Sequence, residues 1–343
     1  MSLVPPKEGR TIFPPGEKIG KYVIKRLIGQ GGYGDIYEVT DESDKSFAMK
    51  VEYVASPKQA LSFERKILEE LKDSSLFAHI HFFGIETHFR YLIMDLLGPS
   101  ISNTRREMPK HKYSLFSALR ISVFMLQCIE DLHKHGYVHC DIKPGNFLLK
   151  AGTNKPLALI DYGLSRQYID PKTKEPFAER HKCGFVGTTK YASLNVHQGM
   201  DTSPRDDLSS WIYSTIEMVD GKLPWTSISE LKKIKRMKYQ IPVGKLLSSL
   251  PSQYLEIYDY VKNLQFLDQP NYQFLYTLLD EAIKTIGDPK TIPFDWESFN
   301  QEKINGFSAI EKLPKAADCE LFDVDYSLMK SAQSSNSRCC LLL

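Results

Sequence analysis

The chain lacks the sequence features of a secreted, membrane-spanning or disulfide-stabilised protein. Its 343 residues include no N-terminal apolar segment of the signal-peptide kind and no run of about 18 apolar residues. The six cysteines are scattered and form no C-x-x-C pair, so the sequence supports neither a zinc site nor a redox motif. A net charge of +2 predicts no strong field that would attract nucleic acid. We therefore expect a cytoplasmic protein with reduced thiols and no nucleic-acid partner.

A P-loop is missing too, but a different glycine-rich run lies near the N-terminus. Strand-like segments flank it, Tyr22-Val23-Ile24 before and Ile36-Tyr37-Glu38-Val39 after, whereas the glycines of a dinucleotide-binding unit open a helix. The run therefore predicts a strand-turn-strand hairpin whose backbone can cover a triphosphate. The candidate nucleotide-binding residues here are Ile28, Gly29, Gln30, Gly31, Gly32, Tyr33, Gly34, Asp35 and Ile36.

A single cation occurs on the next predicted strand, Phe47-Ala48-Met49-Lys50-Val51. Taken alone, Lys50 would be interpreted as a surface lysine at a strand edge. Its position after a glycine hairpin favours a lysine that holds the α- and β-phosphates of a nucleotide.

A candidate partner for this lysine lies on the helix predicted after it. Ser56 as N-cap, Pro57 at the first helical position and Gln59 closing the capping box predict the start of a helix that runs to about Lys72. Glu64 falls on the apolar face of this helix, where an unpaired carboxylate would be costly. We therefore predict that Glu64 pairs with the strand lysine.

The run His139-Cys140-Asp141-Ile142-Lys143-Pro144-Gly145-Asn146 has the spacing of a protein-kinase catalytic loop. Asp141 can accept the proton of an attacking hydroxyl, and Lys143 can neutralise a transferring phosphoryl group. The amide oxygen of Asn146 can bind a metal ion.

A further aspartate follows the short apolar strand Leu157-Ala158-Leu159-Ile160. Asp161, with Tyr162 and Gly163 after it, predicts a D-F-G element in which tyrosine replaces phenylalanine. Asp161 and Asn146 are the candidate metal ligands, and we predict ATP and Mg²⁺ as the cofactors. Five elements thus occur in the order that a protein kinase requires.

Five further stretches carry a more specific resemblance. The chain resembles the casein kinase 1 superfamily, near its tau-tubulin kinase branch, over about Ile19 to Glu297. Ala-Ser-Leu-Asn replaces the A-P-E run of most kinases, a change specific to that superfamily. The stretches are Met94-Asp95-Leu96-Leu97-Gly98-Pro99-Ser100, Gly187-Thr188-Thr189-Lys190-Tyr191-Ala192-Ser193-Leu194-Asn195, Arg205-Asp206-Asp207-Leu208, Leu223-Pro224-Trp225 and Pro293-Phe294-Asp295-Trp296.

The resemblance implies an α+β, two-lobed protein kinase fold and a Ser/Thr protein kinase activity on protein substrates. We expect a kinase domain over residues 19–297, with a small β-rich N-lobe over about 19–95 that holds one helix. A larger helical C-lobe is expected over about 100–297. Residues 1–18 are expected to form an extension and residues 298–343 a tail. We expect a monomer.

The resemblance also assigns residues around the base and the catalytic loop. Met94 resembles the gatekeeper, and Asp95 to Leu97 resemble the hinge that bonds the adenine edge. Ala48 and Ile36 would lie above the base, with Leu148 and Ile160 below it. Asp207 resembles the aspartate that fixes the catalytic-loop backbone.

Two departures from the family pattern concern Tyr162 and Cys140. Tyr162 adds a hydroxyl that needs a partner. Cys140 replaces an arginine that normally gathers a phosphorylated activation loop, which argues against regulation of that kind. Lys143 followed by Pro144 resembles the Ser/Thr-specific form of the loop.

Basic residues near the presumed activation segment are candidate contacts for an acidic or already phosphorylated substrate. Arg166 and Lys190 flank this segment, and residues 180–182 could contribute. The lysine-rich run from Ile228 to Tyr239 could be an anion site or a localisation signal, but a solvated helix face is favoured.

The chain ends in Cys340-Leu341-Leu342-Leu343, which satisfies C-a-a-X with leucine last, the geranylgeranyl type. Cys339 is an adjacent palmitoylation candidate, and two lipid chains would anchor the protein on the cytosolic face of a membrane. The alternative is a plain hydrophobic end.

The histidines are expected to have structural roles. His79, His81 and His88 carry no metal prediction, because no acidic or cysteine ligand lies at matching spacing. His133 is expected to interact with the negative end of a helix that starts at Ser114 and stops at Gly136. A second apolar helix is expected to start near residue 207.

Two alternatives to an active protein kinase stay open at the level of sequence. A pseudokinase scaffold would bind partners without turnover, and only Cys140 favours it. A small-molecule kinase would lack the segment from Gly187 to Asn195, which shapes a peptide site.

Overall fold

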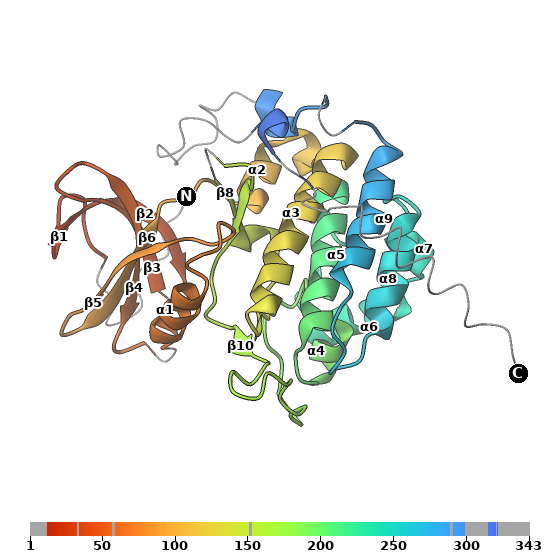
Figure 1. The fold of residues 1–343 in the computed structure, drawn as a ribbon, viewed down its shortest axis with the longest axis horizontal. Helices are drawn as coiled ribbons and strands as arrows, with labels where there is room; N and C mark the ends of the chain where they lie inside the picture. Colours follow the sequence, from red (N-terminus) through yellow and green to blue (C-terminus); the bar gives the residue numbers. More distant parts are fainter. Residues whose placement is uncertain are drawn as a thin grey trace, which may run out of the picture.

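A β-sheet lobe and a helical lobe lie side by side in the computed structural model, which describes residues 12–32, 34–56, 59–150, 153–288, 291–298, 315–319 and 321 (Figure 1). The predicted α+β, two-lobed kinase fold is confirmed. The predictions for Tyr33, Pro57, Cys339 and Cys340, and for most of the two terminal segments, fall outside the described residues.

In the described part of the N-lobe, six strands form one antiparallel sheet in the order β1-β2-β3-β4-β6-β5. The predicted glycine hairpin is present as β2 and β3, with Gly31 opposite Gly34. The strands are β1 (Lys18–Ile19), β2 (Tyr22–Gly31), β3 (Gly34–Thr40), β4 (Ser46–Tyr53), β5 (Ile80–Ile85) and β6 (Phe89–Asp95).

The N-lobe helix α1 (Leu61–Glu70) starts later than predicted. Its N-cap is Ala60, and the Glu52 carboxylate of β4 accepts hydrogen bonds from the backbone N–H groups of Ala60 and Leu61 at 2.5 and 2.9 Å. The capping role predicted for Ser56 is therefore wrong, because a carboxylate from the neighbouring strand satisfies the free N–H groups instead.

The C-lobe is built around α3 (Leu115–Lys134), which begins and ends where predicted. The Ser114 hydroxyl caps it by accepting from the Ser117 N–H at 3.2 Å, and Gly136 follows at a φ of +83°. Most of its side chains are buried, because α5 (Pro204–Asp220), α9 (Tyr272–Lys284) and β9 (Leu157–Leu159) all contact it.

Helix α5 begins three residues before the predicted position. Pro204 is at its first turn, and the Asp206 carboxylate accepts from the Ser203 N–H at 2.9 Å. The remaining C-lobe elements are α2 (Ile101–Glu107), η1 (Pro109–His111), β7 (Tyr137–Val138), η2 (Pro144–Asn146), β8 (Phe147–Leu149), β10 (Arg166–Gln167), α4 (Leu194–Gln198), α6 (Leu231–Gln240), α7 (Val243–Leu246), α8 (Gln253–Asn263), η3 (Asp295–Ser298) and η5 (Ala316–Asp318).

Part of the predicted tail packs on the C-lobe. Ala316 and Leu321 are buried, and the Gln127 side chain of α3 donates to the Leu321 carbonyl at 2.7 Å. Glu297 accepts from the Ala316 N–H at 2.7 Å. Residues 316 and 321 therefore lie against the C-lobe, the latter beside α3.

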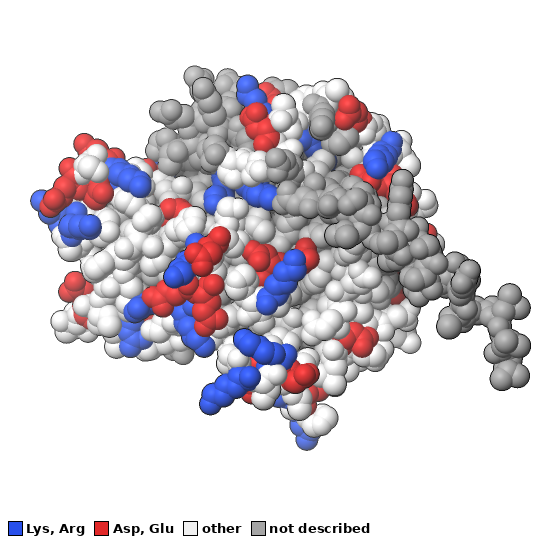
Figure 2. All heavy atoms as spheres, in the orientation of Figure 1, with Lys and Arg blue, Asp and Glu red and all other residues white. Residues whose placement is uncertain are grey.

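Positive and negative side chains lie together in small mixed groups on the visible face, with wide uncharged areas between them (Figure 2). Within the described residues, no helix has both the length and the apolar character that crossing a membrane would require.

Candidate active site

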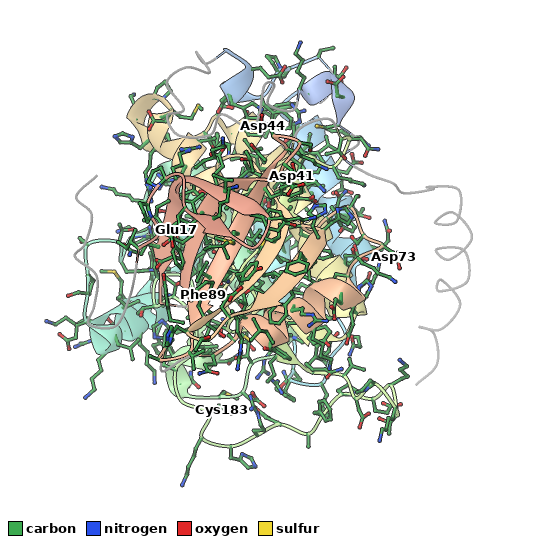
Figure 3. All side chains as sticks on the ribbon, turned by 90° about the vertical axis from the view of Figure 1, so that its left-hand side faces the viewer. Glu17, Asp41, Asp44, Asp73, Phe89 and Cys183 are labelled. Atoms are coloured by element: carbon green, nitrogen blue, oxygen red, sulfur yellow. The ribbon has the colours of Figure 1, made fainter. Side chains whose placement is uncertain are left out.

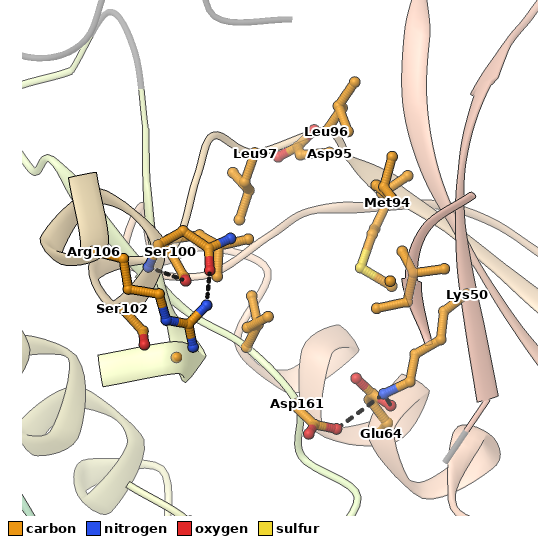
Figure 4. A pocket seen from close by; sticks show the side chains of 18 residues that line it. Lys50, Glu64, Met94, Asp95, Leu96, Leu97, Ser100, Ser102, Arg106 and Asp161 are labelled. Atoms are coloured by element: carbon orange, nitrogen blue, oxygen red, sulfur yellow. Dashed lines mark hydrogen bonds and ion pairs between the residues drawn. The ribbon is translucent and has the colours of Figure 1, made fainter. Parts of the chain in front are cut away.

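A cavity of about 330 Å³ lies between the lobes (Figure 4). The glycine hairpin, β4 and the hinge line it from one side, and α2, β8 and Asp161 line it from the other. Of the residues predicted to bind nucleotide, the cavity is lined by Ile28, Gly29, Ile36, Ala48, Lys50, Glu64, Met94, Asp95, Leu97, Leu148, Ile160 and Asp161.

Several lining residues were not predicted, and most come from α2 and its N-cap. The Ser100 hydroxyl accepts from the Asn103 N–H at 3.1 Å, which fixes the first turn of this helix directly after the hinge. An N-cap serine in this place was the available signal. The unpredicted lining residues are Ser100, Ser102, Asn103, Arg106 and Gly145, and Leu96 of the predicted hinge lines the cavity too.

Only some residues of the glycine hairpin line the cavity. Ile36 faces the cavity, so the neighbouring Asp35 side chain points to the opposite side of the strand, where it is fully buried. Gly34 has a φ of +130°, and a Cβ there would lie 2.1 Å from the Val51 carbonyl oxygen. Gly31 and Gly32 have open space around them, but neither they nor Gln30 and Gly34 line the cavity.

Lys50 joins two carboxylates at the inner end of the cavity (Figure 4). Its ammonium lies 2.5 Å from Glu64 Oε2 and 3.1 Å from Asp161 Oδ1. Burial alone would lower the pKa of Lys50, but the two carboxylates raise it above its ordinary value. Burial raises the pKa of Glu64. Burial also favours a higher pKa for Asp161, but the charge and hydrogen bond of Lys50, together with the charges of His139 and Lys143, lower it. The arrangement keeps Lys50 cationic beside an ionised Asp161.

Hydrogen bonds link three polar residues of the catalytic loop to one another or to the segment beside it. Lys143 Nζ lies 2.5 Å from Asp141 Oδ2 and 3.2 Å from the Thr188 hydroxyl. The Asn146 amide donates to the Asp141 carbonyl at 2.9 Å. Asp141 Oδ1 is buried and has no hydrogen-bond partner among the described residues. This oxygen is therefore available to an incoming donor.

Asp207 holds the backbone before Asp141. Its carboxylate accepts from the His139 N–H at 2.7 Å and the Cys140 N–H at 2.9 Å. The same carboxylate lies 2.9 Å from His133 Nε2. His133 lies in the last turn of α3, as predicted, and it is also a buried link between α3 and Asp207.

The strand that carries Asp161 is tied to the catalytic loop. Ile160 N–H donates to the Asn146 carbonyl at 2.9 Å, and His139 Nε2 lies 3.0 Å from the Ile160 carbonyl. The Tyr162 hydroxyl donates to the Leu159 carbonyl at 2.7 Å, which provides the partner that its burial requires. These bonds fix Asp161 and Asn146 relative to each other.

The donor set at this site suits Mg²⁺. The Asn146 amide nitrogen is already engaged, so its oxygen is left for a ligand, and Asp161 supplies a carboxylate. No three His, Cys, Asp or Glu side chains of the described residues converge into a protein-only metal site. Mg²⁺ commonly binds through one or two carboxylates together with substrate phosphates and water.

The hinge carries an unexpected acidic partner for two histidines. Asp95 Oδ2 lies 2.9 Å from His79 Nδ1, and Asp95 Oδ1 lies 2.7 Å from His81 Nε2. Burial alone would raise the pKa of Asp95, but hydrogen bonds from His79 and His81 lower it. Sequence spacing gave no sign of this carboxylate, because Asp95 belongs to β6, which pairs with β5.

Both predicted substrate-contact cations are engaged by the protein itself. Lys190 forms an ion pair with Glu217, and Arg105 Nη2 lies 3.3 Å from the same carboxylate oxygen. Arg166 donates to the Thr202 carbonyl and lies 3.4 Å from Asp201.

The comparisons with known proteins agree with this geometry. The family model described as "Protein kinase domain" matches residues 22–283. A protein of Dictyostelium discoideum described as "Probable serine/threonine-protein kinase" is 35% identical to this chain over 289 residues. The match covers 83% of this chain but only 58% of that relative.

Proposed function

The chain belongs to the protein kinase family, and we propose that it is an active enzyme. The reaction is transfer of the γ-phosphoryl group of ATP to serine or threonine hydroxyls of proteins. The observation that carries the proposal is the convergence of Lys50, Glu64 and Asp161 with the catalytic loop around one cavity. The description of the Dictyostelium relative supports the Ser/Thr class.

Asp141 is the base in this proposal. Its unpartnered Oδ1 accepts the proton of the attacking hydroxyl, while Oδ2 stays bonded to Lys143. Lys143 lies between Asp141 and Thr188, where its charge neutralises the moving phosphoryl group. Catalysis then depends on positioning and electrostatics, without a covalent enzyme intermediate.

Lys50 and the backbone of the glycine hairpin hold the nucleotide phosphates. Met94 and the residues from Asp95 to Leu97 border the base, between Ala48 and Ile36 on one side and Leu148 and Ile160 on the other. Asp161 and Asn146 would hold Mg²⁺, which supplies charge neutralisation between the phosphates when bound.

An acidic acceptor fits the charges beside the catalytic loop. Glu217 is shared by Lys190 and Arg105, and it also accepts from the Tyr191 hydroxyl. Because two cations share one carboxylate, Lys190 can turn to a substrate anion and leave Glu217 paired with Arg105. Arg166 is less free to do so, since Asp201 and the Thr202 carbonyl hold it.

The finer placement in the casein kinase 1 superfamily, near the tau-tubulin kinase branch, is part of the same proposal. It rests on the Ala192-Ser193-Leu194-Asn195 run and the hinge sequence. We further propose a monomeric cytoplasmic enzyme that attaches to membranes through Cys339 and Cys340.

The decisive experiment is phosphotransfer by the purified protein. Casein is incubated with Mg²⁺ and γ-labelled ATP, and the labelled residues are identified after hydrolysis. The proposal expects label on serine or threonine. Nucleotide binding without any transfer to protein would favour the pseudokinase scaffold and would end the proposal of an active enzyme.

A further inference from the structure

Lys238 of α6 is buried, whereas most cations of the same run are exposed. Its exposed fraction is 3%, equal to that of Ile234 one turn earlier, so both lie on the inner face of the helix. Lys232, Lys233 and Arg236 are exposed. The prediction of a solvated face therefore holds for those three residues and is wrong for Lys238.

The Lys238 ammonium bonds the backbone of the segment from Gly187 to Asn195, which we call the acceptor segment. It donates to the Ala192 carbonyl at 2.6 Å and to the Thr189 carbonyl at 3.1 Å. It also lies 4.7 Å from the ring centre of Tyr213 and 5.0 Å from that of Trp225. Two carbonyls and two aromatic faces thus surround the charge.

No acidic side chain of the described residues pairs with Lys238. Burial lowers the pKa of Lys238 to about 7, so keeping this ammonium inside the protein is costly. A cation buried without a carboxylate is unusual, and both hydrogen bonds of Lys238 are to the acceptor segment.

A second donor holds the same segment from the same side. Trp225 Nε1 donates to the Lys190 carbonyl at 2.8 Å. Together with Lys238 it fixes the carbonyls of residues 189, 190 and 192. Near the Gly187 end of the segment, Lys143 Nζ donates to the Thr188 hydroxyl at 3.2 Å. The acceptor segment is therefore held to α6 at one end and to the catalytic loop at the other.

We propose that Lys238 is a positioning residue for the protein acceptor, which it serves by holding the backbone of residues 189–192 in the shape that docks the acceptor beside Asp141. The proposal rests on the proposed kinase activity and deepens it. Lys238 makes no contact with the cavity between the lobes. Nucleotide binding and acceptor binding should therefore respond differently to its removal.

The test compares Lys238→Met with Lys232→Met. Methionine keeps the unbranched stem against Tyr213 and Trp225 but removes the donor, and Lys232 is an exposed lysine of the same helix. The KM for a protein acceptor, the KM for ATP and the rate of ATP hydrolysis without acceptor are measured. We expect Lys238→Met to raise the acceptor KM by about tenfold or more, since bonds from a charged donor are lost.

Its KM for ATP and its ATP hydrolysis should stay at the wild-type value, and Lys232→Met should change none of the three. A role limited to stability would instead lower all activities in proportion to the folded fraction, which thermal unfolding measures. Trp225→Phe provides a second variant, because it removes the bond to the Lys190 carbonyl and keeps an aromatic ring; it should raise the acceptor KM as well.

An acceptor KM within twofold of wild type in Lys238→Met would overturn the inference, whatever the result for Trp225→Phe. So would an equal rise in the KM values for acceptor and ATP. Absence of transfer by the wild-type protein would instead reject the proposed function itself.

Discussion

Lys50 Nζ and Glu64 Oε2 lie 2.5 Å apart, in an ion pair whose two side chains are only 7% and 4% exposed. The pair joins β4 to α1 across the N-lobe and places the lysine charge 3.1 Å from Asp161. A buried pair of this kind is costly to break by removing one partner, because the other charge is left without compensation.

The first prediction concerns Lys50→Met. We expect loss of measurable phosphotransfer and a clear fall in the unfolding temperature, since breaking a buried pair typically costs about 3–5 kcal/mol. Both are measured on the purified variant, by transfer of label to casein and by thermal unfolding. Lys66→Met is the matched control, because Lys66 is an exposed residue of α1. An unchanged unfolding temperature for Lys50→Met would contradict the account of this pair.

The second prediction concerns the contact between the acceptor segment and the catalytic loop. Gly187 has a φ of +88°, and a Cβ there would lie 2.4 Å from the Cys140 carbonyl oxygen. Gly187→Ala should therefore displace the backbone beside Asp141 and sharply lower kcat, with little change in ATP affinity.

Gly184→Ala is the control for backbone strain alone. Gly184 has a φ of +72°, but a Cβ added there would meet no atom within 4 Å, and its neighbour Cys183 is on a loop that projects from the body (Figure 3). Equal losses of kcat in the two variants would mean that strain, and not the contact with Cys140, is responsible.

The third prediction concerns the pH dependence of stability. Despite its burial, hydrogen bonds and charge from Arg180 and Arg166 lower the pKa of Asp201 to about 2. Because its folded-state pKa lies below the ordinary value of 3.8, Asp201 stabilises the fold above that value, and this contribution is lost as the pH falls toward 2.

Asp201→Asn should therefore lower the free energy of unfolding by a constant amount at pH 5 to 7. The difference from wild type should shrink below about pH 4. Denaturant unfolding of the wild type and the variant between pH 3 and pH 7 measures this difference in the free energy of unfolding. A difference that stays constant down to pH 3 would exclude ionisation of Asp201 as its source.

The fourth prediction concerns the C-terminal cysteines. If Cys340 is prenylated, Cys340→Ser should move the protein from the membrane fraction to the soluble fraction of cells, because a single remaining lipid chain anchors only weakly. Cys319→Ser is the control, since that cysteine packs beside η5 on the C-lobe. An unchanged distribution of Cys340→Ser would remove the lipidation proposal.

Local signals were sufficient for much of the fold. Alternating apolar residues around the glycines predicted the β2–β3 hairpin, and the Ser114 cap with Gly136 predicted both ends of α3. The ion pair of Lys50 with Glu64 was also predictable, because an acid on an apolar helix face needs a partner.

Contacts between distant segments could not be predicted in this way. Glu52 replaces Ser56 as the partner of the first N–H groups of α1 because β4 ends beside that helix. Lys238 resembles its exposed neighbours in sequence, and only the approach of the acceptor segment buries it. Arg166 looked free for substrate, but Asp201 engages it from 35 residues away in the chain.

The most direct test of the central claim is single-turnover phosphotransfer by Asp141→Asn. The account predicts a fall in the transfer rate of about a hundredfold or more, as expected for loss of a general base, with unchanged affinity for Mg²⁺-ATP. Transfer at the wild-type rate would show that Asp141 is not the base and would contradict the proposed mechanism.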